Sequence, residues 1–523
     1  MTNRYIYVTL LAVLSFNAEA FSEEQLSQNT PRLVINITID QLRTDYLEAF
    51  APLYTSDGFK KLLAEGLLFP NASYSFTPLD RASTIATIGT GTTPYYNNIV
   101  GERWLNRETL RPVWCTDDKR YPGINTTDSS SPNNLCTSTI GDELKVATSG
   151  KAIVFAIAPF RDAAILSAGH AANGAFWLDD TKGLWCTSSF YGKSLPAWVQ
   201  AFNGLHAPAS KSGNTSWEPV NDFVGNFSYF MQTGTLKPFK HDVSNYKEYK
   251  TCGLINSDVT TLALQCMAST GMGKDRVTDL LCLTYYAGNY KHQSVTKCQI
   301  ELQDTYVRLD QEISRLIKES ELRYGKDNVL FVVTSTGYCD EEAADYESYH
   351  VPSGTFYMSR SASLMNMYFG AFWGQGQYVE TYFRNHIFLN HKLLESKKIS
   401  ITDATNHAQE FLAMMSGVRN VYTSLQLLTS NNEQLQKIRN GFNPEHCGDL
   451  VIETAPGWKL LNEDTQEQVL MRASFIPFPI FFYGAGTHAE RVNLPVTTDR
   501  IAPTIARSIR IRAPNACSSE PLF

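Results

Sequence analysis

Short, nearly uninterrupted apolar runs recur along the chain, each followed by a loop and a stretch of helical periodicity. The clearest runs are Leu33–Ile39, Ala152–Ala158, Leu280–Tyr285, Val329–Thr334 and Pro479–Tyr483. Strands that are apolar on both faces are typical of a parallel sheet covered by helices on both sides. We therefore read these runs as the buried strands of such a sheet.

Helical periodicity between these runs supplies the layers that would cover the sheet. The helices are predicted over Phe59–Glu65, Gly141–Thr148, Ile300–Glu319, Ala404–Met415 and Arg500–Ile509. Alternation of strands and helices indicates an α/β fold with a doubly wound, mostly parallel sheet sandwiched by helices. Ligands in such folds bind at the carboxyl ends of the strands.

Two long stretches interrupt the alternation. Residues 186–271 are rich in Asn, Ser, Gly, Trp and Phe, and residues 338–426 begin acidic and then become aromatic. Long ordered loops in this fold class usually cover the binding site, so both stretches are predicted to be cap insertions. The alternative is that they are surface excursions. One domain over residues 21–523 is expected to carry both.

The first twenty residues have the features of a secretory signal peptide. Arg4 supplies the positive charge, Ile6–Phe16 the apolar segment, and Ala18-Glu19-Ala20 the cleavage site. No segment reaches the roughly 18 apolar residues of a membrane helix. We expect cleavage near Ala20, a periplasmic or secreted protein, and no transmembrane segment.

The net charge and the cysteine content bear on which partners and which disulfide bonds to expect. A net charge of −7 and a pI near 5.9 give no electrostatic reason to expect a nucleic-acid partner. Ten cysteines in an exported chain favour disulfides. Cys115 and Cys136 are expected to lie near each other and form one bridge. The other pairings stay open, and Cys282 is read as a buried small hydrophobe.

Three motifs carry the candidate chemistry. A strand ends at Asp40, the turn Thr77–Gly91 opens a helix, and the segment Asn98–Trp104 follows. Together they resemble the alkaline phosphatase superfamily, in particular the phosphate-irrepressible alkaline phosphatases of bacteria and the type I phosphodiesterase/nucleotide pyrophosphatases. The resemblance implies an alkaline-phosphatase-like fold in which two zinc ions assist phosphate ester hydrolysis.

Of the family's two positions at the end of the first strand and at the nucleophile turn, only the first keeps the family's residue. The first-strand aspartate is present as Asp40, although the same residue could simply cap a helix. The nucleophilic threonine is replaced by Arg81, whose guanidinium stays protonated and cannot attack phosphorus. The hydroxyls of Ser83 and Thr84 are nearby, but they fall within the first helical turn rather than at its tip.

The remaining metal ligands of the family are largely replaced. At the family's Asp-x-x-x-His pair, Asn289 replaces the aspartate and His292 lies one residue before the position of the histidine. At the family's Asp-His pair, the sequence reads Ser335-Thr336-Gly337. Asp40 and His292 are thus the only surviving candidates for metal binding. The carboxylates that could rebuild a site are Asp340, Glu341 and Glu342, with His350 as a further donor. The last family histidine maps onto Pro477, and His488 is expected at the surface.

The family's phosphate contacts are changed as well. Glu102 replaces an asparagine, and only a shifted Arg161 remains of a Lys-x-Arg segment. The candidate binding residues are Asp40, Arg81, Glu102, Arg103, Arg161, Asn289 and His292. Asp40 and Arg81 are predicted to form a salt bridge in which the guanidinium stands in for the lost cation. Alternatively, Arg81 reaches solvent beside Arg103 or Arg161 and forms an anion site.

Three hypotheses follow from these substitutions. The first is a catalytically degenerate pseudophosphatase that binds a small anionic ligand or an envelope protein and needs no cofactor. The second is an active metal-dependent phosphomonoesterase or phosphodiesterase with a rearranged site, which would use zinc. The third is a structural subunit of an envelope complex whose pocket has no role.

Overall fold

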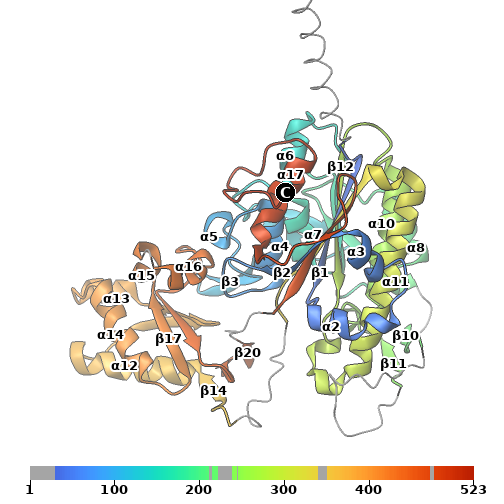
Figure 1. Ribbon diagram of the computed structural model, residues 1–523. Coiled ribbons are helices and arrows are strands. Elements are labelled where there is room, and N and C mark those ends of the chain that lie inside the picture. Colours follow the sequence, from blue (N-terminus) through green and yellow to red (C-terminus); the bar gives the residue numbers. More distant parts are fainter. Residues whose placement is uncertain are drawn as a thin grey trace, which may run out of the picture.

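A large mixed sheet forms the centre of the molecule in the computed structural model (Figure 1). The structure describes residues 30–210, 215–221, 238–243, 245–339, 350–430, 432–470 and 476–523. The sheet has twelve strands in the order β22-β2-β21-β13-β1-β12-β7-β8-β9-β5-β6, and β23 pairs with β2. None of the described helices is both long and apolar enough to cross a membrane.

The middle of the sheet is parallel. β1 (Leu33–Asp40) lies between β12 (Asp279–Tyr286) and β13 (Val329–Ser335), and β12 continues to β7 (Val154–Ala158) and β8 (Gly174–Leu178). In this register the last residues of the three central strands lie side by side. The carboxyl ends of β1, β12 and β13 therefore meet at one edge, where ligands bind in α/β folds.

Antiparallel strands extend the sheet on both sides. β21 (Phe478–Gly484) pairs antiparallel with β13 and with β2 (Leu67–Ser73). The remaining strands of this sheet are β5 (Asp117–Ile124), β6 (Ser129–Ser130), β9 (Trp185–Ser188), β22 (Glu490–Arg491) and β23 (Val496–Thr497). The hairpin of β3 (Arg103–Asn106) and β4 (Arg111–Trp114) forms a small separate sheet. β10 (Thr215–Trp217) and β11 (His241–Val243) form another.

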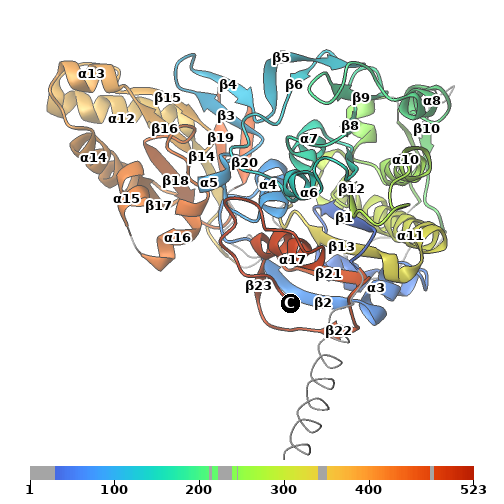
Figure 2. The same cartoon turned by 90° about the horizontal axis from the view of Figure 1, so that it is seen from above.

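Helices cover both faces of the main sheet (Figures 1 and 2). Along β1, Ile35 and Ile37 belong to one core cluster and Val34 to the other, because side chains alternate across a strand. One face carries α2 (Thr44–Ala49), α3 (Phe59–Glu65), α8 (Ala197–Leu205), α10 (Leu254–Thr270) and α11 (Gln299–Tyr324). The other carries α4 (Arg81–Thr90), α6 (Ile140–Ala147), α7 (Arg161–Ala168) and α17 (Ile501–Ser508). The short helices α5 (Pro94–Asn97) and α9 (Tyr246–Tyr249) lie in connections.

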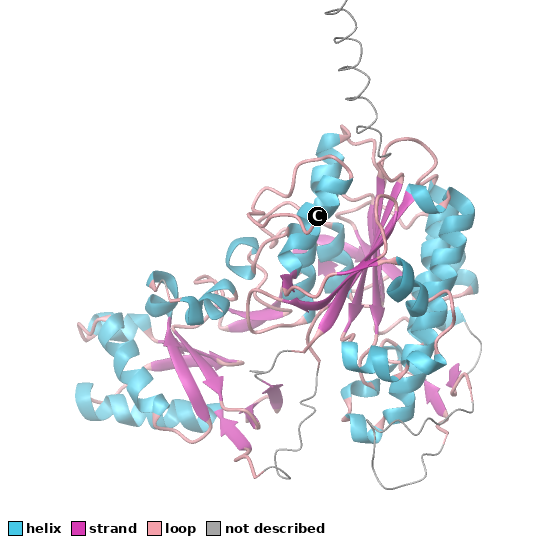
Figure 3. Cartoon of the chain, viewed as in Figure 1, coloured by secondary structure: helices cyan, strands magenta, loops and turns pink. Residues whose placement is uncertain are grey.

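A side lobe, residues 354–470, lies beside the main sheet (Figures 1 and 3). Its four-stranded sheet has the order β15 (Val379–Phe383), β16 (His386–Leu389), β18 (Leu450–Thr454) and β17 (Val418–Thr423). A three-stranded sheet joins β14 (Gly354–Tyr357), β19 (Trp458–Asn462) and β20 (Glu467–Leu470). Its helices are α12 (Met358–Trp373), α13 (His391–Ser396), α14 (Ile401–Ala413), α15 (Ser424–Thr429) and α16 (Glu433–Asn440).

The α/β fold predicted from the sequence is confirmed: each predicted strand and helix is present, with ends that differ by several residues at most. Two boundaries in the expected domain organisation differ from the observed ones. The lobe runs on to Leu470 rather than ending at 426, and residues 254–270 of the first insertion form α10, which packs in the main core. A capping role for either segment stays a prediction.

The disulfide predicted between Cys115 and Cys136 is wrong. Both are free thiols, and they have opposite environments, since Cys115 is buried and Cys136 is exposed. The Cys115 side chain packs in the core with Trp104, whereas the backbone N–H of Cys136 donates to the carbonyl of Asn97. The fact that both cysteines lie on one loop-rich segment therefore does not determine where their side chains point. Cys282 is buried, as expected of a small hydrophobe.

Candidate functional site

Arg81 is the first residue of α4, in the turn that follows Asp80. Asp80 caps the helix: its carboxylate accepts from the backbone N–H of Ser83 at 3.0 Å, and the Ser83 hydroxyl lies 3.2 Å from the N–H of Asp80. The hydroxyl of Thr84 donates to the carbonyl of Asp80 at 2.7 Å. These hydroxyls are thus used to form the helix start, which is the ordinary role of such residues in a first turn.

The Arg81 guanidinium is held by three carboxylates, one for each of its nitrogens. Nη1 lies 3.5 Å from Asp40 Oδ2, Nη2 lies 2.7 Å from Glu102 Oε1, and Nε lies 2.9 Å from Asp162 Oδ2. The side chains of Arg81, Asp40 and Asp162 are at most 10% exposed, and that of Glu102 is 21% exposed. The predicted salt bridge between Asp40 and Arg81 is confirmed, and it is one arm of a larger cluster.

The environment of Arg81 shifts the protonation equilibria of the cluster. Burial works against its charge, but the carboxylates of Asp162, Glu102 and Asp40 raise the pKa of Arg81 well above its usual range. Burial also raises the pKa of Glu102 to about 7, although Arg81 acts in the opposite direction. The ring of Phe160 covers the guanidinium, with Cζ 3.9 Å from the ring centroid. Arg81 is therefore a fixed buried cation, while Glu102 changes charge near neutral pH.

Asp40 is oriented by a hydroxyl from the neighbouring strand. Thr336, just beyond β13, donates to Asp40 Oδ1 at 2.9 Å and accepts from the backbone N–H of Gln41 at 2.9 Å. The helix-cap alternative for Asp40 is wrong, because the N-cap of α2 is Arg43 and no side chain caps that helix. A threonine hydroxyl thus contacts the first-strand aspartate in the segment where the resemblance places an Asp-His metal-binding pair.

A second arginine approaches the cluster from the side lobe. Arg384, in the turn between β15 and β16, places Nη1 3.3 Å from Asp80 Oδ2 and Nε 3.9 Å from Glu467 Oε1. The backbone N–H of Glu102 donates to the same Asp80 oxygen at 2.6 Å. A side chain on Gly101 would meet Asp80 Oδ2 at 2.8 Å and Arg384 Nη1 at 3.2 Å. A larger residue at position 101 would therefore have to displace one of these two side-chain ends where the two parts of the molecule meet.

Arg103 and Arg161 lie beside this cluster, and the acids that they bind are not those that hold Arg81. Arg103 binds Glu467 at 2.8 Å, and Arg161 binds Asp117 at 2.9 Å; both guanidiniums lie 5.0–5.8 Å from the ring of Trp114. Arg81 does not reach solvent beside them. The alternative of a solvent-facing arginine anion site is therefore wrong for Arg81.

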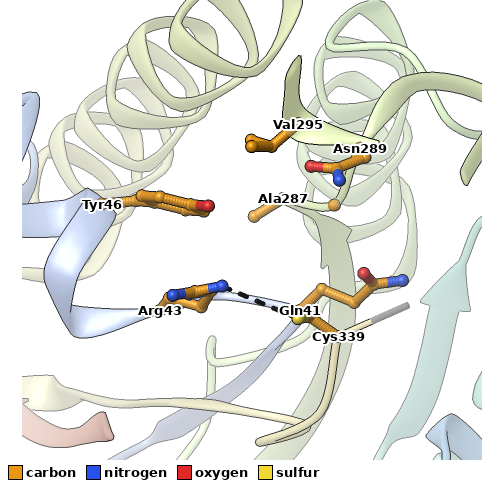
Figure 4. A pocket seen from close by; sticks show the side chains of 8 residues that line it. Gln41, Arg43, Tyr46, Ala287, Asn289, Val295 and Cys339 are labelled. Atoms are coloured by element: carbon orange, nitrogen blue, oxygen red, sulfur yellow. Dashed lines mark hydrogen bonds between the residues drawn. The ribbon is translucent and has the colours of Figure 1, made fainter. Parts of the chain in front are cut away.

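Asn289 and His292 lie on a different part of the sheet edge. Asn289 lines a small pocket together with Gln41, Arg43, Tyr46, Ala287, Gly288, Val295 and Cys339 (Figure 4). The pocket has a volume of about 20 Å³, which is enough for roughly one water molecule. His292 is exposed and contacts the edge of Tyr286, with ring centroids 6.4 Å apart. Neither residue is among those that contact the Arg81 guanidinium.

The other residues considered as replacement ligands do not supply a site. His488 is at the surface as expected and contacts Glu490 at 2.8 Å, and His350 is exposed. Pro477 offers only its carbonyl, which accepts from the N–H of Thr44. Asp340, Glu341 and Glu342 lie outside the described residues. Among those described, no three His, Cys, Asp or Glu side chains are grouped so as to hold a metal ion.

Sequence reasoning missed five members of the cluster, namely Asp80, Phe160, Asp162, Thr336 and Arg384. Asp162 and Phe160 flank the shifted Arg161, so the acidic neighbour of that arginine was the available signal. Arg384 lies 304 positions from Asp80 in the chain. No local pattern marks such a contact.

The chain belongs to the type I phosphodiesterase / nucleotide pyrophosphatase family, whose model matches residues 34–474. It is 27% identical to alkaline phosphatase PafA of Elizabethkingia meningoseptica, with 98% of each chain covered. It is also 27% identical to alkaline phosphatase PhoV of Synechococcus elongatus, covering 93% of this chain and 91% of that one. A calcium-transporting ATPase of Myroides odoratus is 28% identical, covering 97% and 96%.

Solved structures agree with this assignment. The crystal structure of wild-type PafA superposes with a TM-score of 0.82 at 25% identity, covering 94% of this chain and 98% of that one. Murine ectonucleotide pyrophosphatase / phosphodiesterase 5 has a TM-score of 0.51 at 10% identity, covering 92% and 95%, and shows the fold alone. The alkaline-phosphatase-like architecture is thus shared, and family members are metal-dependent phosphoric ester hydrolases.

The residues at this site do not fit a pair of zinc ions. A catalytic zinc uses about three protein ligands, usually from His, Cys, Asp and Glu. Here Asp40 already contacts Arg81 and Thr336, Asn289 is a poor zinc ligand, and His292 is exposed. A guanidinium bound by three carboxylates stands where the resemblance places the nucleophile.

Proposed function

We propose that this protein is an exported, catalytically degenerate member of its family that acts by binding. The observation that carries the proposal is the placement of Arg81. A residue that cannot act as a nucleophile stands at the nucleophile position, and three carboxylates hold it there. Export rests on the signal-like first twenty residues.

The charge of the cluster favours a protein partner over a small anionic ligand. Four carboxylates, those of Asp40, Asp80, Glu102 and Asp162, face two guanidiniums. A phosphate at the same place would be repelled by the excess negative charge. The side lobe also exposes large apolar side chains: Met367 is 71%, Phe372 56% and Met414 76% exposed. A contiguous apolar surface marks a protein contact, and Met367 and Phe372, both on α12, are the residues that we propose to form it.

The test of the lost activity is turnover by the purified protein. We expect hydrolysis of p-nitrophenyl phosphate and of its bis-ester to stay at the buffer rate, with or without added zinc, manganese or calcium. The matched variant is Asp40→Ala, which removes the one family ligand that remains. Turnover that is abolished both by a chelator and by Asp40→Ala would support the rearranged active enzyme instead.

The binding role has a separate test, in which the protein is cross-linked in an envelope fraction and its partners are identified. A specific partner should be lost when Met367 and Phe372 are both replaced by glutamate. The matched control is Leu322→Glu, since Leu322 is 84% exposed but lies on α11 in the main body. Equal capture by both variants would argue against the lobe as the binding surface. Dependence on the lobe without any role of the Arg81 cluster would favour the structural-subunit hypothesis.

A further inference from the structure

We propose that the joint between the β3–β4 hairpin and the side lobe is acid-sensitive: two neutral histidines of the lobe, His386 and His446, close it, and protonation of their rings releases the lobe from the main body. His386 is the first residue of β16, and His446 lies in the loop before β18. The inference goes beyond the proposed binding role and does not depend on the loss of catalytic activity.

The hairpin and the lobe lie side by side, and side chains of the hairpin reach into the lobe (Figure 2). The ring of Trp104 stacks on that of His446, with centroids 4.2 Å apart and planes at 23°. Arg107, in the turn of the hairpin, donates to the carbonyl of Cys447 at 2.8 Å and lies 3.3 Å from Asp449. One of the two histidines is thus part of the contact itself.

The joint buries nitrogen atoms that have no hydrogen-bond partner among the described residues. They are Nδ1 of His386, Nε2 of His446, and Nε of Arg107 and of Arg384. A protonated imidazole needs an acceptor at both of its nitrogens, and burial without one is costly. On His386 an added proton would also face two cations, Arg384 in the adjoining turn and Arg107 in the hairpin. Both rings are therefore held neutral for as long as the joint is closed.

The sign of the pH effect follows from this burial. Burial, together with Arg384 and Arg107, lowers the pKa of His386 from 6.5 to about 3, and burial alone lowers that of His446 to about 4. A separated lobe binds protons at these rings where the docked lobe does not. Docking is therefore strongest above pH 6.5 and weakens as pH falls. At about pH 5 each ring should weaken docking by about 30-fold, and both together by about 10³-fold.

Other charged groups at the joint act differently. His391 lies 3.0 Å from Asp449, which raises the pKa of His391, but both belong to the lobe and stay together when it is released. Glu102 keeps a proton up to a pKa of about 7, which favours the folded protein in acid and opposes the two histidines. The histidine effect is therefore measured as a difference between variants. The acids that face Arg384 are Asp80, Glu102 and Glu467.

The experiment is amide hydrogen exchange of the full-length protein at about pH 7.5 and about pH 5, corrected for the intrinsic exchange rates. The reporter is Thr77, whose N–H in the main body donates to the carbonyl of Lys437 in the lobe at 3.0 Å. Its protection should fall by about 10³-fold at the lower pH and return when the pH is restored. The amides of the central strand β1 should change by less than about tenfold, because the main core stays folded.

Replacing the two rings should remove the response. The double variant His386→Gln/His446→Phe has no titrating group at these positions and keeps an aromatic ring against Trp104. Protection of Thr77 in this variant should stay within about tenfold over the same range, whereas His446→Phe alone should leave a fall of about 30-fold. The matched control is His407→Gln, which removes a histidine that packs on Phe372 within the lobe and should respond like the wild type.

Each outcome supports or overturns the acid-sensitive joint. Constant protection of Thr77 in the wild type overturns it, and so does a double variant as acid-sensitive as the wild type. Equal losses at Thr77 and in β1 would show global unfolding and overturn it as well. If the double variant does not fold, His446→Phe decides, since an undiminished response overturns the proposal. Glu102→Gln should still release the lobe in acid, and a response abolished by this substitution would assign the effect to Glu102 instead.

Discussion

The Arg81 guanidinium lies 3.5 Å from the carboxylate of Asp40, where a cation from one segment meets the acid that closes the first strand. The two residues are unequal partners. Arg81 has two further carboxylates, Glu102 and Asp162, whereas Asp40 has in addition the hydroxyl of Thr336. This inequality determines what each substitution should do.

Replacing Arg81 should destabilise the protein more than replacing Asp40. Arg81→Met leaves three acids around an apolar side chain, and loss of one partner from a buried pair costs about 3–5 kcal/mol. Asp40→Asn leaves Arg81 with two carboxylates and should cost less than half of that. The double variant should be no less stable than Arg81→Met alone. Urea unfolding of the three variants, with Arg120→Ala as a surface control, measures each difference; equal losses for the two single variants would contradict the prediction.

Glu102 should make the stability depend on pH. Its pKa is raised by burial from 4.5 to about 7 in the folded state. Between these values the unfolded chain releases the proton while the folded one keeps it, so the free energy of unfolding should fall as pH rises through this window. The expected loss is on the order of 1–3 kcal/mol. Glu102→Gln should flatten the pH profile; an unchanged profile would show that Glu102 is not the titrating group.

The sequence predicted the layers of the fold because burial on both faces leaves a continuous apolar run. Ile35 and Val34 face opposite cores, and both had to be apolar. The helix predicted over Ile300–Glu319 is present as α11 (Gln299–Tyr324), because its apolar positions recur with a helical period. The side lobe was harder to delimit, since its strands are short and its sheet joins segments far apart in the chain.

The site was only partly predictable. The pairing of Asp40 with Arg81 followed from two positions that the family brings together. Asp162 and Arg384 were missed because their roles depend on tertiary contacts, with Arg384 reaching the cap of a helix 304 positions away. The disulfide prediction was wrong for a related reason. Whether Cys115 points into the core or toward a partner depends on packing that sequence spacing does not encode.

His170 should contribute a second, smaller pH dependence. Its Nδ1 lies 3.0 Å from Asp142 Oδ2 and its Nε2 lies 3.0 Å from the carbonyl of Leu135, so the protonated ring can donate twice. The hydrogen bond to Asp142 raises the pKa of His170 above 6.5. The stabilisation is therefore present below that pH and lost as pH rises through the folded value.

At 34% side-chain exposure the contribution of His170 should be below about 1 kcal/mol. His170→Gln should remove the slope above about pH 6.5 and leave the Glu102 window unchanged. Titration of the ring protons by NMR gives the pKa directly. A value at or below 6.5 would contradict the assignment.

Arg384 should hold the side lobe against the main body. Its guanidinium lies between Asp80 of the helix cap and Glu467 of β20, and its backbone has a φ of 51°, a left-handed conformation that is uncommon for residues other than glycine. Arg384→Ala removes the only charge among the described residues that is shown bridging Asp80 to the side lobe. Amide hydrogen exchange should then quicken in β15 and β16 and at the start of α4.

The central strand β1 should keep its protection in Arg384→Ala, because the main core is untouched. The matched control is Arg419→Ala, which removes an exposed arginine 3.4 Å from Glu453 within the same lobe and should leave α4 unaffected. High salt should reproduce part of the Arg384→Ala effect in the wild type, since partly exposed ion pairs are screened. Faster exchange confined to the lobe, with α4 unchanged, would show that the turn is only locally strained and that Arg384 does not couple the two parts.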